Sequence, residues 1–137
     1  MAIPALVNGV LPPGTYSATC AEVWAAFDQI GSTTRPWLNQ ALPHAITLIW
    51  LRDPSAIIYV DGSYVTGKVN PNDVDLAIRS DIWDDTLFLS AFRIAHPGEE
   101  QMVDFFFNDT HSSQHMEDLF REIQGSSTRK GVLLLLP

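Results

Sequence analysis

Three aspartates in apolar surroundings are the residues of this sequence best suited to chemistry. Asp73 and Asp75 alternate with apolar residues, and Asp104 has apolar neighbours on both sides. Side chains two residues apart on a strand share one face, with Cα atoms about 6.6 Å apart, so Asp73 and Asp75 can reach the same cations. Burying an unpaired carboxylate is costly, and a hard divalent ion such as Mg²⁺ would lower that cost. If the strand of Asp104 pairs beside the strand of the other two, the three aspartates form a metal-binding triad.

A Gly-Ser pair precedes these aspartates along the chain. Gly62 and Ser63 follow the apolar segment 56–60, and nine residues separate Ser63 from the first aspartate of the Asp-x-Asp pair. Together with the later lone Asp104, this order resembles the nucleotidyltransferase superfamily typified by DNA polymerase β. The resemblance covers about residues 56–107 and is to the small bacterial members called minimal nucleotidyltransferases, including an uncharacterised bacterial subgroup.

The resemblance implies a metal-dependent enzyme and a role for each of these residues. The enzyme would transfer a nucleoside monophosphate from a nucleoside triphosphate, such as ATP, to a hydroxyl of a protein or of an RNA end. Asp73 and Asp75 would hold two Mg²⁺ or Mn²⁺ ions, while Asp104 would bind the catalytic ion and help deprotonate the acceptor hydroxyl. Gly62 would let the backbone approach the phosphates, and Ser63 would donate its N–H and hydroxyl to the β- or γ-phosphate.

The sequence departs from the pattern of minimal nucleotidyltransferases at several points. Thr66 stands where many members have an arginine, and Lys68 is the candidate substitute as a nucleotide-phosphate contact. Asn72 stands where many members have a serine. The sequence also lacks the separate helical domain with which larger relatives grip the base and the acceptor. We therefore expect a protein partner that supplies the missing second domain.

The aspartates and Ser63 can also have structural roles that involve no catalysis. Asp73 and Asp75 can belong to a solvated turn that leads into a strand. Asp104 can be a charge that protects an edge strand from aggregation. Ser63 can be an ordinary turn residue.

Other polar side chains favour structural roles over chemistry. Lys68, Arg129 and Lys130 are more often solvated than bound to phosphate. His111 and His115 have the spacing of helical zinc ligands, but the residues between them lack the glutamate of a metalloprotease motif, which favours an ordinary surface helix.

A second class of function stays open at this point. The chain can be a non-catalytic interaction protein that acts by binding a partner, as the antitoxin of a toxin–antitoxin pair or a regulatory subunit would. The aspartate triad favours the enzyme, because a pure binding module gains nothing from three converging carboxylates. Both functions can hold together if the enzyme modifies a protein partner.

The composition narrows the classes of partner. The 137 residues, 46% of them hydrophobic, suffice for one domain with a packed core. The net charge of -8 opposes binding to duplex DNA. Cys20 is the single cysteine and cannot form an intrachain disulfide, which suits a cytoplasmic location. The sequence shows no leader pattern and no apolar run long enough for a bilayer, so we expect no membrane association.

The apolar patterns predict an α/β (α+β) fold, in which helices flank a small mixed sheet. An extended arm over residues 1–18 precedes a single domain over residues 19–137. The predicted helices lie near 19–31, 34–49, 81–95 and 116–123, and the predicted strands near 56–60, 74–78, 102–107 and 131–136.

Local signals add three expectations. Thr19 and Glu22 have the spacing of a capping box at the start of the first helix. Pro43 should kink or split the second helix. Four tryptophans lie within helical patterns and are expected to pack in the core: Trp24, Trp37, Trp50 and Trp83.

Overall fold

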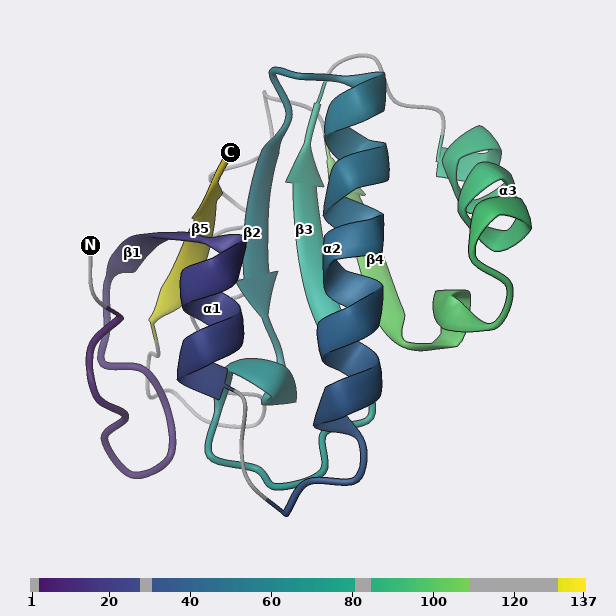
Figure 1. Cartoon of the computed structure of the whole chain (residues 1–137). Helices are drawn as coiled ribbons and strands as arrows, with labels where there is room; N and C mark the ends of the chain where they lie inside the picture. The colour runs from purple at the N-terminus through teal and green to yellow at the C-terminus, as the bar shows by residue number, and fades with distance from the viewer. Residues whose placement is uncertain (1–2, 28–30, 81–84, 109–130) are drawn as a thin grey trace.

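Five strands form one sheet in the computed structural model of the chain, which describes residues 3–27, 31–80, 85–108 and 131–137 (Figure 1). The strands are β1 (Thr15–Thr19), β2 (Ile57–Asp61), β3 (Val74–Arg79), β4 (Val103–Asn108) and β5 (Val132–Leu136). Their order in the sheet is β1-β5-β2-β3-β4. The predicted helix near 116–123 lies outside the described residues, as do Trp83, His111, His115, Arg129 and Lys130.

The sheet is mixed. β1 pairs in parallel with β5 and β3 pairs in parallel with β4, whereas β2 is antiparallel to both of its neighbours. This arrangement confirms the predicted α/β (α+β) fold. β2 to β5 lie where the sequence predicts strands, whereas β1 was not predicted. It lies largely within the segment 1–18 that was expected to be an extended arm.

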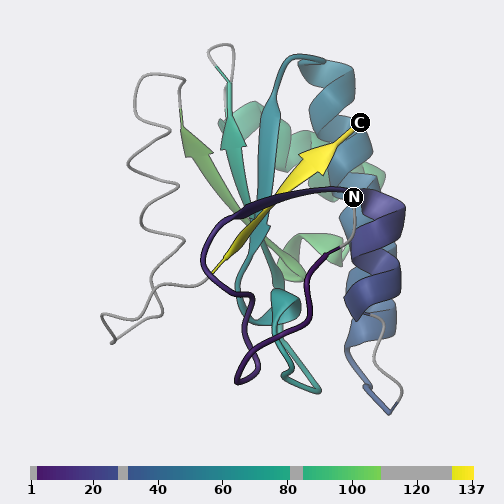
Figure 2. The same cartoon turned by 90° about the vertical axis from the view of Figure 1, so that its left-hand side faces the viewer.

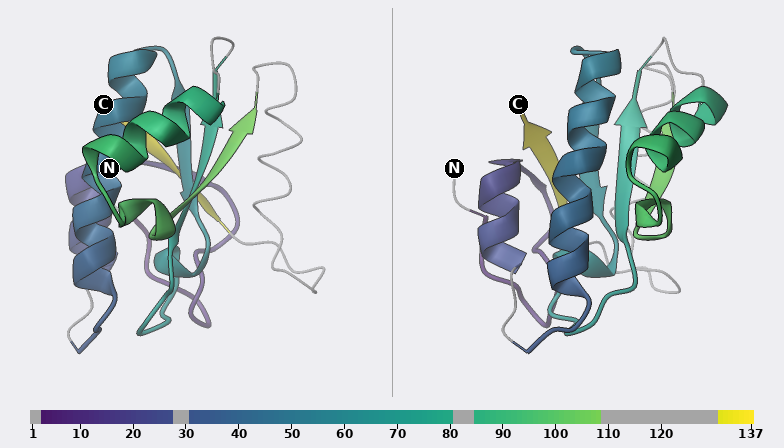
Figure 3. Two further views of the ribbon diagram at one scale, coloured as in Figure 1. Left: turned by 90° about the vertical axis from the view of Figure 1, so that its right-hand side faces the viewer. Right: turned by 45° about the vertical axis from the view of Figure 1, so that its right-hand side comes forward.

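The three α-helices that the structure describes lie on one face of the sheet (Figures 1 and 2). They are α1 (Cys20–Phe27), α2 (Arg35–Arg52) and α3 (Asp85–Ala95). Figure 3 shows α3 on the same side as α2, near β4. None of these helices combines the length and the apolar character needed to cross a bilayer. The main core lies between this helix layer and the sheet, and its largest fully buried apolar side chains include Leu38, Leu42, Ile49, Ile58, Leu76, Ile78, Phe88 and Leu133.

The start of α1 has the predicted capping box. Glu22 Oε1 accepts a hydrogen bond from the Thr19 N–H at 2.9 Å, and Thr19 Oγ1 accepts one from the Glu22 N–H at 3.2 Å. The bond from the Thr19 N–H stabilises the charged carboxylate and lowers the pKa of Glu22. Because β1 ends at Thr19, the capping box also makes a sharp junction between the strand and α1.

α2 runs without interruption through Pro43, so of the two predicted effects, a kink or a split, the split does not occur. An interior proline costs a helix about 3 kcal/mol. The helix offsets this cost by burying an apolar face on both sides of the proline, since Leu38, Leu42, Ala45 and Ile49 are all at most 1% exposed.

Two of the tryptophans do not pack in the core. Trp24 is 46% exposed and Trp37 is 60% exposed, so the core prediction is wrong for both. In α1 the buried residues are Val23 and Phe27, and Trp24 follows Val23 by about 100° of helical rotation, which turns it toward solvent. Trp50 is partly buried, and its indole N–H donates to the Ala56 carbonyl at 3.0 Å.

Residues of β3 alternate between the two faces of the sheet. Val74, Leu76 and Ile78 belong to the main core beneath the helices, while Ala77 belongs to a second, small apolar cluster with Tyr59 and Val132. Side chains alternate along a strand, so odd-numbered positions of β3 face away from the helix layer. Asp75 therefore lies on the face of the sheet opposite α2.

Candidate functional site

Three aspartates occupy one row across neighbouring strands. Asp61 of β2 pairs in register with Asp75 of β3, and Asp75 pairs with Asp104 of β4. Asp73 precedes Asp75 by two residues, at the entrance to β3. The register thus explains why carboxylates from separate parts of the chain meet on one face of the sheet.

The predicted triad comes together. One carboxylate oxygen from each of Asp73, Asp75 and Asp104 lies within 4.8 Å of the others. β4 is an edge strand and Asp104 is exposed, so the location alone would also suit a charge that protects an edge. An edge charge of that kind does not require two further carboxylates beside it.

The crowding of negative charge changes the acidity of this cluster. The pKa of Asp75 rises to about 7, first because burial disfavours the charged form and then because of the negative charges of Asp73, Asp104 and Asp61. Burial, followed by the charge of Asp73, also raises the pKa of Asp104. A cation placed among these carboxylates would relieve the repulsion.

Asp61 is a member of the carboxylate row that sequence reasoning missed. It is the last residue of β2 and only 3% exposed, and it contributes to the raised pKa of Asp75. A signal was present in the sequence, because Asp61 directly follows four apolar strand residues and directly precedes the Gly-Ser pair.

Gly62 lies against the carboxylate of Asp75. The backbone of Gly62 has a φ of 81°, and a Cβ atom at this position would lie 2.5 Å from Asp75 Oδ2. Glycine is therefore required here both by its backbone conformation and by the space that Asp75 occupies. The sequence predicted Gly62 as a close-approach residue for phosphates, and the structure places it at the edge of the carboxylate cluster.

A short 3₁₀ helix, Ser63–Val65, follows Gly62 and begins the loop that leads to β3. Ser63 is its first residue, directly beyond the end of β2. The Thr66 hydroxyl donates to the Ser63 carbonyl at 2.6 Å, which closes the turn. Lys68 lies farther along the loop with an exposed side chain, and its role as a nucleotide-phosphate contact stays a prediction.

Arg35 holds this loop from inside. Its guanidinium is completely buried, and its Nη1 donates to the carbonyls of Phe27 and Tyr64, both at 2.8 Å. Its Nη2 donates to the carbonyls of Thr66 at 2.9 Å and Lys68 at 2.8 Å. One side chain of α2 therefore fixes three successive points of the loop that follows Ser63.

Two more contacts fasten the loop. The Tyr64 hydroxyl donates a hydrogen bond to Asn39 Oδ1 of α2, and both side chains are buried. The Gly67 N–H donates to the Gly9 carbonyl at 2.9 Å, which joins the loop to the N-terminal segment. The backbone around Ser63 is thus positioned by two distant segments of the chain.

Sequence reasoning did not identify Arg35 as part of this framework. The sequence contains one weak signal. Arg35 lies in the first turn of α2, where a positive charge interacts unfavourably with the helix dipole, so its presence there indicates another role. The reason for its place is the set of carbonyl oxygens that it binds, which no local pattern reveals.

The donor set of Asp73, Asp75 and Asp104 fits a hard divalent cation. Carboxylate oxygens are the ligands that Mg²⁺ and Mn²⁺ prefer, and Mg²⁺ sites typically combine one or two carboxylates with water or phosphate oxygens. Cys20 is no alternative nucleophile at this site, because it lies at the start of α1 and burial raises the pKa of its thiol.

Comparisons with known proteins place the chain in a family without assigning an activity. Neither the curated proteins nor the solved structures contain a match to the chain. The sequence profile of a family of unknown function, DUF6932, matches residues 4–135 and so spans the described sheet together with the aspartate cluster. The chain belongs to the DUF6932 family.

Proposed function

We propose that this protein is a metal-dependent nucleotidyltransferase, which transfers a nucleoside monophosphate from a nucleoside triphosphate to a hydroxyl. The observation that carries the proposal is the convergence of Asp73, Asp75 and Asp104, with ligand atoms within 4.8 Å of one another. The Gly62-Ser63 turn directly beside this cluster supports it, because such a turn suits phosphate binding.

Asp73 and Asp75 would hold Mg²⁺ or Mn²⁺, with Asp104 as a further ligand. A bound divalent ion would polarise the phosphoryl oxygens and neutralise the charge that develops on them. The raised pKa of Asp75 supports this assignment, because a carboxylate that is crowded by like charges gains more than an isolated one from a nearby cation.

Asp104 is the candidate general base. Its carboxylate lies at the exposed edge strand β4, where an acceptor hydroxyl can approach it, and belongs to the same ligand cluster as Asp73 and Asp75. As Asp104 accepts the proton of the acceptor hydroxyl, that oxygen forms a bond to the α-phosphorus. The bond from the α-phosphorus to the oxygen bridging to the β-phosphorus breaks, and pyrophosphate leaves.

The loop after Gly62 is suited to orient the triphosphate. Ser63 would donate its N–H and hydroxyl to the β- or γ-phosphate. The hydrogen bonds of Arg35 and Tyr64 already hold the loop in one conformation. The loop therefore loses little conformational entropy when the triphosphate binds.

The acceptor that we propose is a hydroxyl of a protein or an RNA end. A net charge of -8 gives little driving force for binding duplex DNA. We propose that a protein partner supplies further contacts to the nucleobase and to the acceptor. We also propose a cytoplasmic location, in which the single cysteine would stay reduced.

The test uses the full chain with α-labelled nucleoside triphosphates and Mg²⁺ or Mn²⁺. Candidate acceptors are the protein itself, the products of neighbouring genes and short RNAs. We expect label on one acceptor and equimolar release of pyrophosphate. Asp104→Asn should abolish transfer without unfolding the protein, because asparagine keeps the size of the side chain but loses its charge and basicity.

Glu100→Gln is the matched control, since it makes the same change in net charge outside the aspartate cluster. It should transfer label at the rate of the wild type. If Asp104→Asn is as fast as the wild type, the catalytic assignment is wrong. An interaction protein of the antitoxin or regulatory kind would then take the place of the enzyme, to be tested by binding to the same neighbouring gene products.

A further inference from the structure

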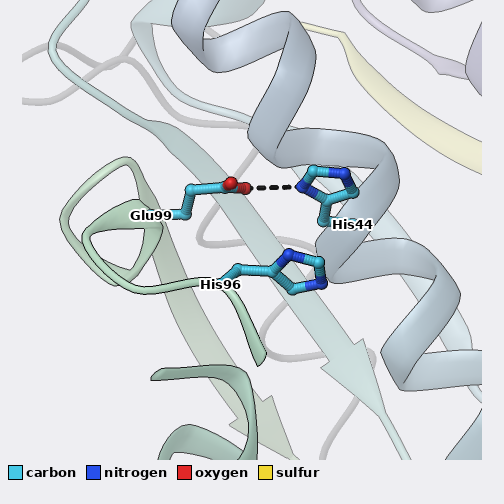
Figure 4. Close-up of side chains that lie close together, drawn as sticks. All are labelled: His44, His96 and Glu99. Carbon is cyan, nitrogen blue, oxygen red and sulfur yellow. Dashed lines mark hydrogen bonds and ion pairs between the residues drawn. The ribbon is translucent and has the colours of Figure 1, made fainter. Parts of the chain in front are cut away.

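A second cluster of metal-ligating side chains lies in the helix layer of the protein. It consists of His44 in α2, His96 directly after α3, and Glu99 in the 3₁₀ helix Glu99–Gln101 (Figure 4). One ligand atom from each of the three residues lies within 4.8 Å of the others, and all three are partly buried.

The three side chains are already in contact with one another. His44 Nδ1 and Glu99 Oε1 share a hydrogen bond of 2.8 Å. The rings of His44 and His96 are stacked, with centroids 4.0 Å apart and planes 7° from parallel. Figure 4 shows the Glu99 carboxylate beside the edge of the His44 ring and the His96 ring next to it.

The backbone around His96 fixes this arrangement. The His96 N–H donates to the Phe92 carbonyl at 2.8 Å, and the Glu99 N–H donates to the His96 carbonyl at 3.1 Å. The ring of His96 also packs against Phe92 at 5.6 Å between centroids, and Phe92 is completely buried. Gly98, with a φ of 87°, makes the reversal that returns the chain to α2.

We propose that His44, His96 and Glu99 bind a divalent transition-metal ion of the zinc class. Two imidazoles and one carboxylate are a recurring ligand set for Zn²⁺, and imidazole nitrogen distinguishes this set from the oxygen ligands that Mg²⁺ selects. Around a tetrahedral ion with bonds of about 2.0–2.1 Å, ligand atoms lie about 3.4 Å apart. An imidazole nitrogen binds a metal in the plane of its ring, so one of the two stacked rings must turn out of the stack for both histidines to share the ion.

The proposed site is open on one side. A surface pocket of about 180 Å³ adjoins it at Glu99 and is lined by Trp37, Gln40, Pro97, Gly98, Glu99 and Met102. Three protein ligands leave a fourth position for water or another small ligand, and the partial exposure of His44 and Glu99 leaves the ion a path of entry.

This site is independent of the aspartate cluster and of the proposed nucleotidyl transfer. His44 belongs to α2, a helix that covers one face of the sheet (Figure 1). Asp75 lies on the opposite face, as the alternation of β3 residues between the two apolar clusters shows. Zn²⁺ can also bind carboxylate oxygen, so the aspartate cluster must be removed by substitution before the histidine site is titrated.

The experiment titrates Zn²⁺ into metal-stripped full-length protein that carries Asp73→Asn and Asp75→Asn, which removes the oxygen site. We expect one Zn²⁺ per chain by calorimetry, no uptake of Mg²⁺, and the visible absorption of four-coordinate Co²⁺ when cobalt replaces zinc. Adding His44→Gln or His96→Asn should abolish both signals. Glu99→Gln should weaken Zn²⁺ binding, because a neutral amide replaces the charged carboxylate ligand.

Two control variants separate this site from other possible zinc ligands. His111→Gln with His115→Gln removes the other two histidines, and Cys20→Ser removes the thiol; these variants should keep Zn²⁺ binding. His44→Gln and His96→Asn are independent tests, and circular dichroism shows which of them is folded. Absence of Zn²⁺ binding, or binding that is unchanged in a folded variant of either histidine, would overturn the proposal.

Discussion

Gly62 packs so tightly on Asp75 that a Cβ atom at position 62 would lie 2.5 Å from Asp75 Oδ2. The backbone just beyond the end of β2 and the central carboxylate of the site are therefore in direct contact. A change in the backbone at Gly62 must displace the carboxylate, and a change in the carboxylate reaches the loop that begins at Gly62.

Gly62→Ala tests this contact. We expect the substitution to displace Asp75, to weaken stabilisation by Mn²⁺, and to lower the free energy of unfolding by at least the 1–2 kcal/mol or so that an L-residue costs at positive φ. Gly98→Ala is a control for alanine at a positive φ without a clash, because Gly98 has a φ of 87° and a Cβ atom there would meet no other atom within 4 Å. Urea unfolding with and without Mn²⁺ measures both effects, and equal Mn²⁺ responses in the two variants would contradict the contact.

Asp75 should make the metal-free protein less stable as the pH rises. Its pKa is raised from 3.8 to about 7 in the folded protein, so folding favours the protonated form. The contribution of Asp75 to the free energy of unfolding is fully present below about pH 4 and is lost as the pH rises through 7. Between pH 5 and pH 8, the loss should be on the order of 1–2 kcal/mol, after allowance for solvent screening at this partly exposed carboxylate.

Asp75→Asn should remove most of that slope and leave the contribution of Asp104, whose pKa is also raised. Asparagine carries no charge at any of these pH values, so the variant should be more stable than the wild type at pH 8 when both are in EDTA. Urea unfolding at several pH values gives the comparison, and Glu100→Gln controls for the change in net charge. A wild-type slope that persists in Asp75→Asn would show that another group causes it.

Much of this architecture could be predicted because its signals are local. The alternation of apolar residues around Asp75 and the box formed by Thr19 and Glu22 depend on residues close in sequence. The lone charge at Asp104 inside an apolar strand was informative for the same reason. The parallel pairing of β3 with β4 then brought Asp104 beside Asp75, as the triad required.

Other features depend on distant parts of the chain. β1 has little apolar alternation, and its strand pairing comes from β5, at the other end of the sequence. The burial of Arg35 depends on carbonyl oxygens that only the folded loop brings together. Trp37 belongs to an apolar pattern but lies on the wrong side of α2, where it lines the pocket beside Glu99. Local periodicity alone cannot reveal such long-range contacts.

Mn²⁺ should stabilise the folded protein through the aspartate cluster. An ion that binds only the folded state adds about 2.7 kcal/mol at a free concentration one hundred times its dissociation constant. Thermal melts of the wild type should therefore shift upward with Mn²⁺. Melts of Asp73→Asn with Asp75→Asn should not shift, and no shift in either protein would favour the reading of these residues as a solvated turn.

Arg35→Lys should disrupt the loop that carries Ser63. Lysine keeps the positive charge but has a single nitrogen, which cannot reach the four carbonyl oxygens that the guanidinium binds. We expect a loss of about 3 kcal/mol or more in the free energy of unfolding. Arg52→Lys, at the exposed end of α2, should change it by less than about 0.5 kcal/mol. Urea unfolding measures both, and similar values would contradict the role of Arg35.

Asp61 and Asp104 flank Asp75 in one row, yet they should differ in function. Both charges raise the pKa of Asp75, that of Asp104 more than that of Asp61. Asp61→Asn and Asp104→Asn should therefore both lower this pKa in the metal-free protein, with the larger change in Asp104→Asn. Carboxyl carbon chemical shifts, followed by NMR during a pH titration, measure the midpoint for Asp75.

Asp61→Asn and Asp104→Asn should differ clearly in how much Mn²⁺ stabilises them. Asp104 offers an oxygen to the cluster of ligand atoms, together with Asp73 and Asp75, so Asp104→Asn should lose part of the stabilisation by Mn²⁺. Asp61 stands beside the cluster as a buried charge, and Asp61→Asn should keep stabilisation by Mn²⁺ if it remains folded. Loss of the Mn²⁺ effect in a folded Asp61→Asn variant would make Asp61 a metal ligand and extend the site onto β2.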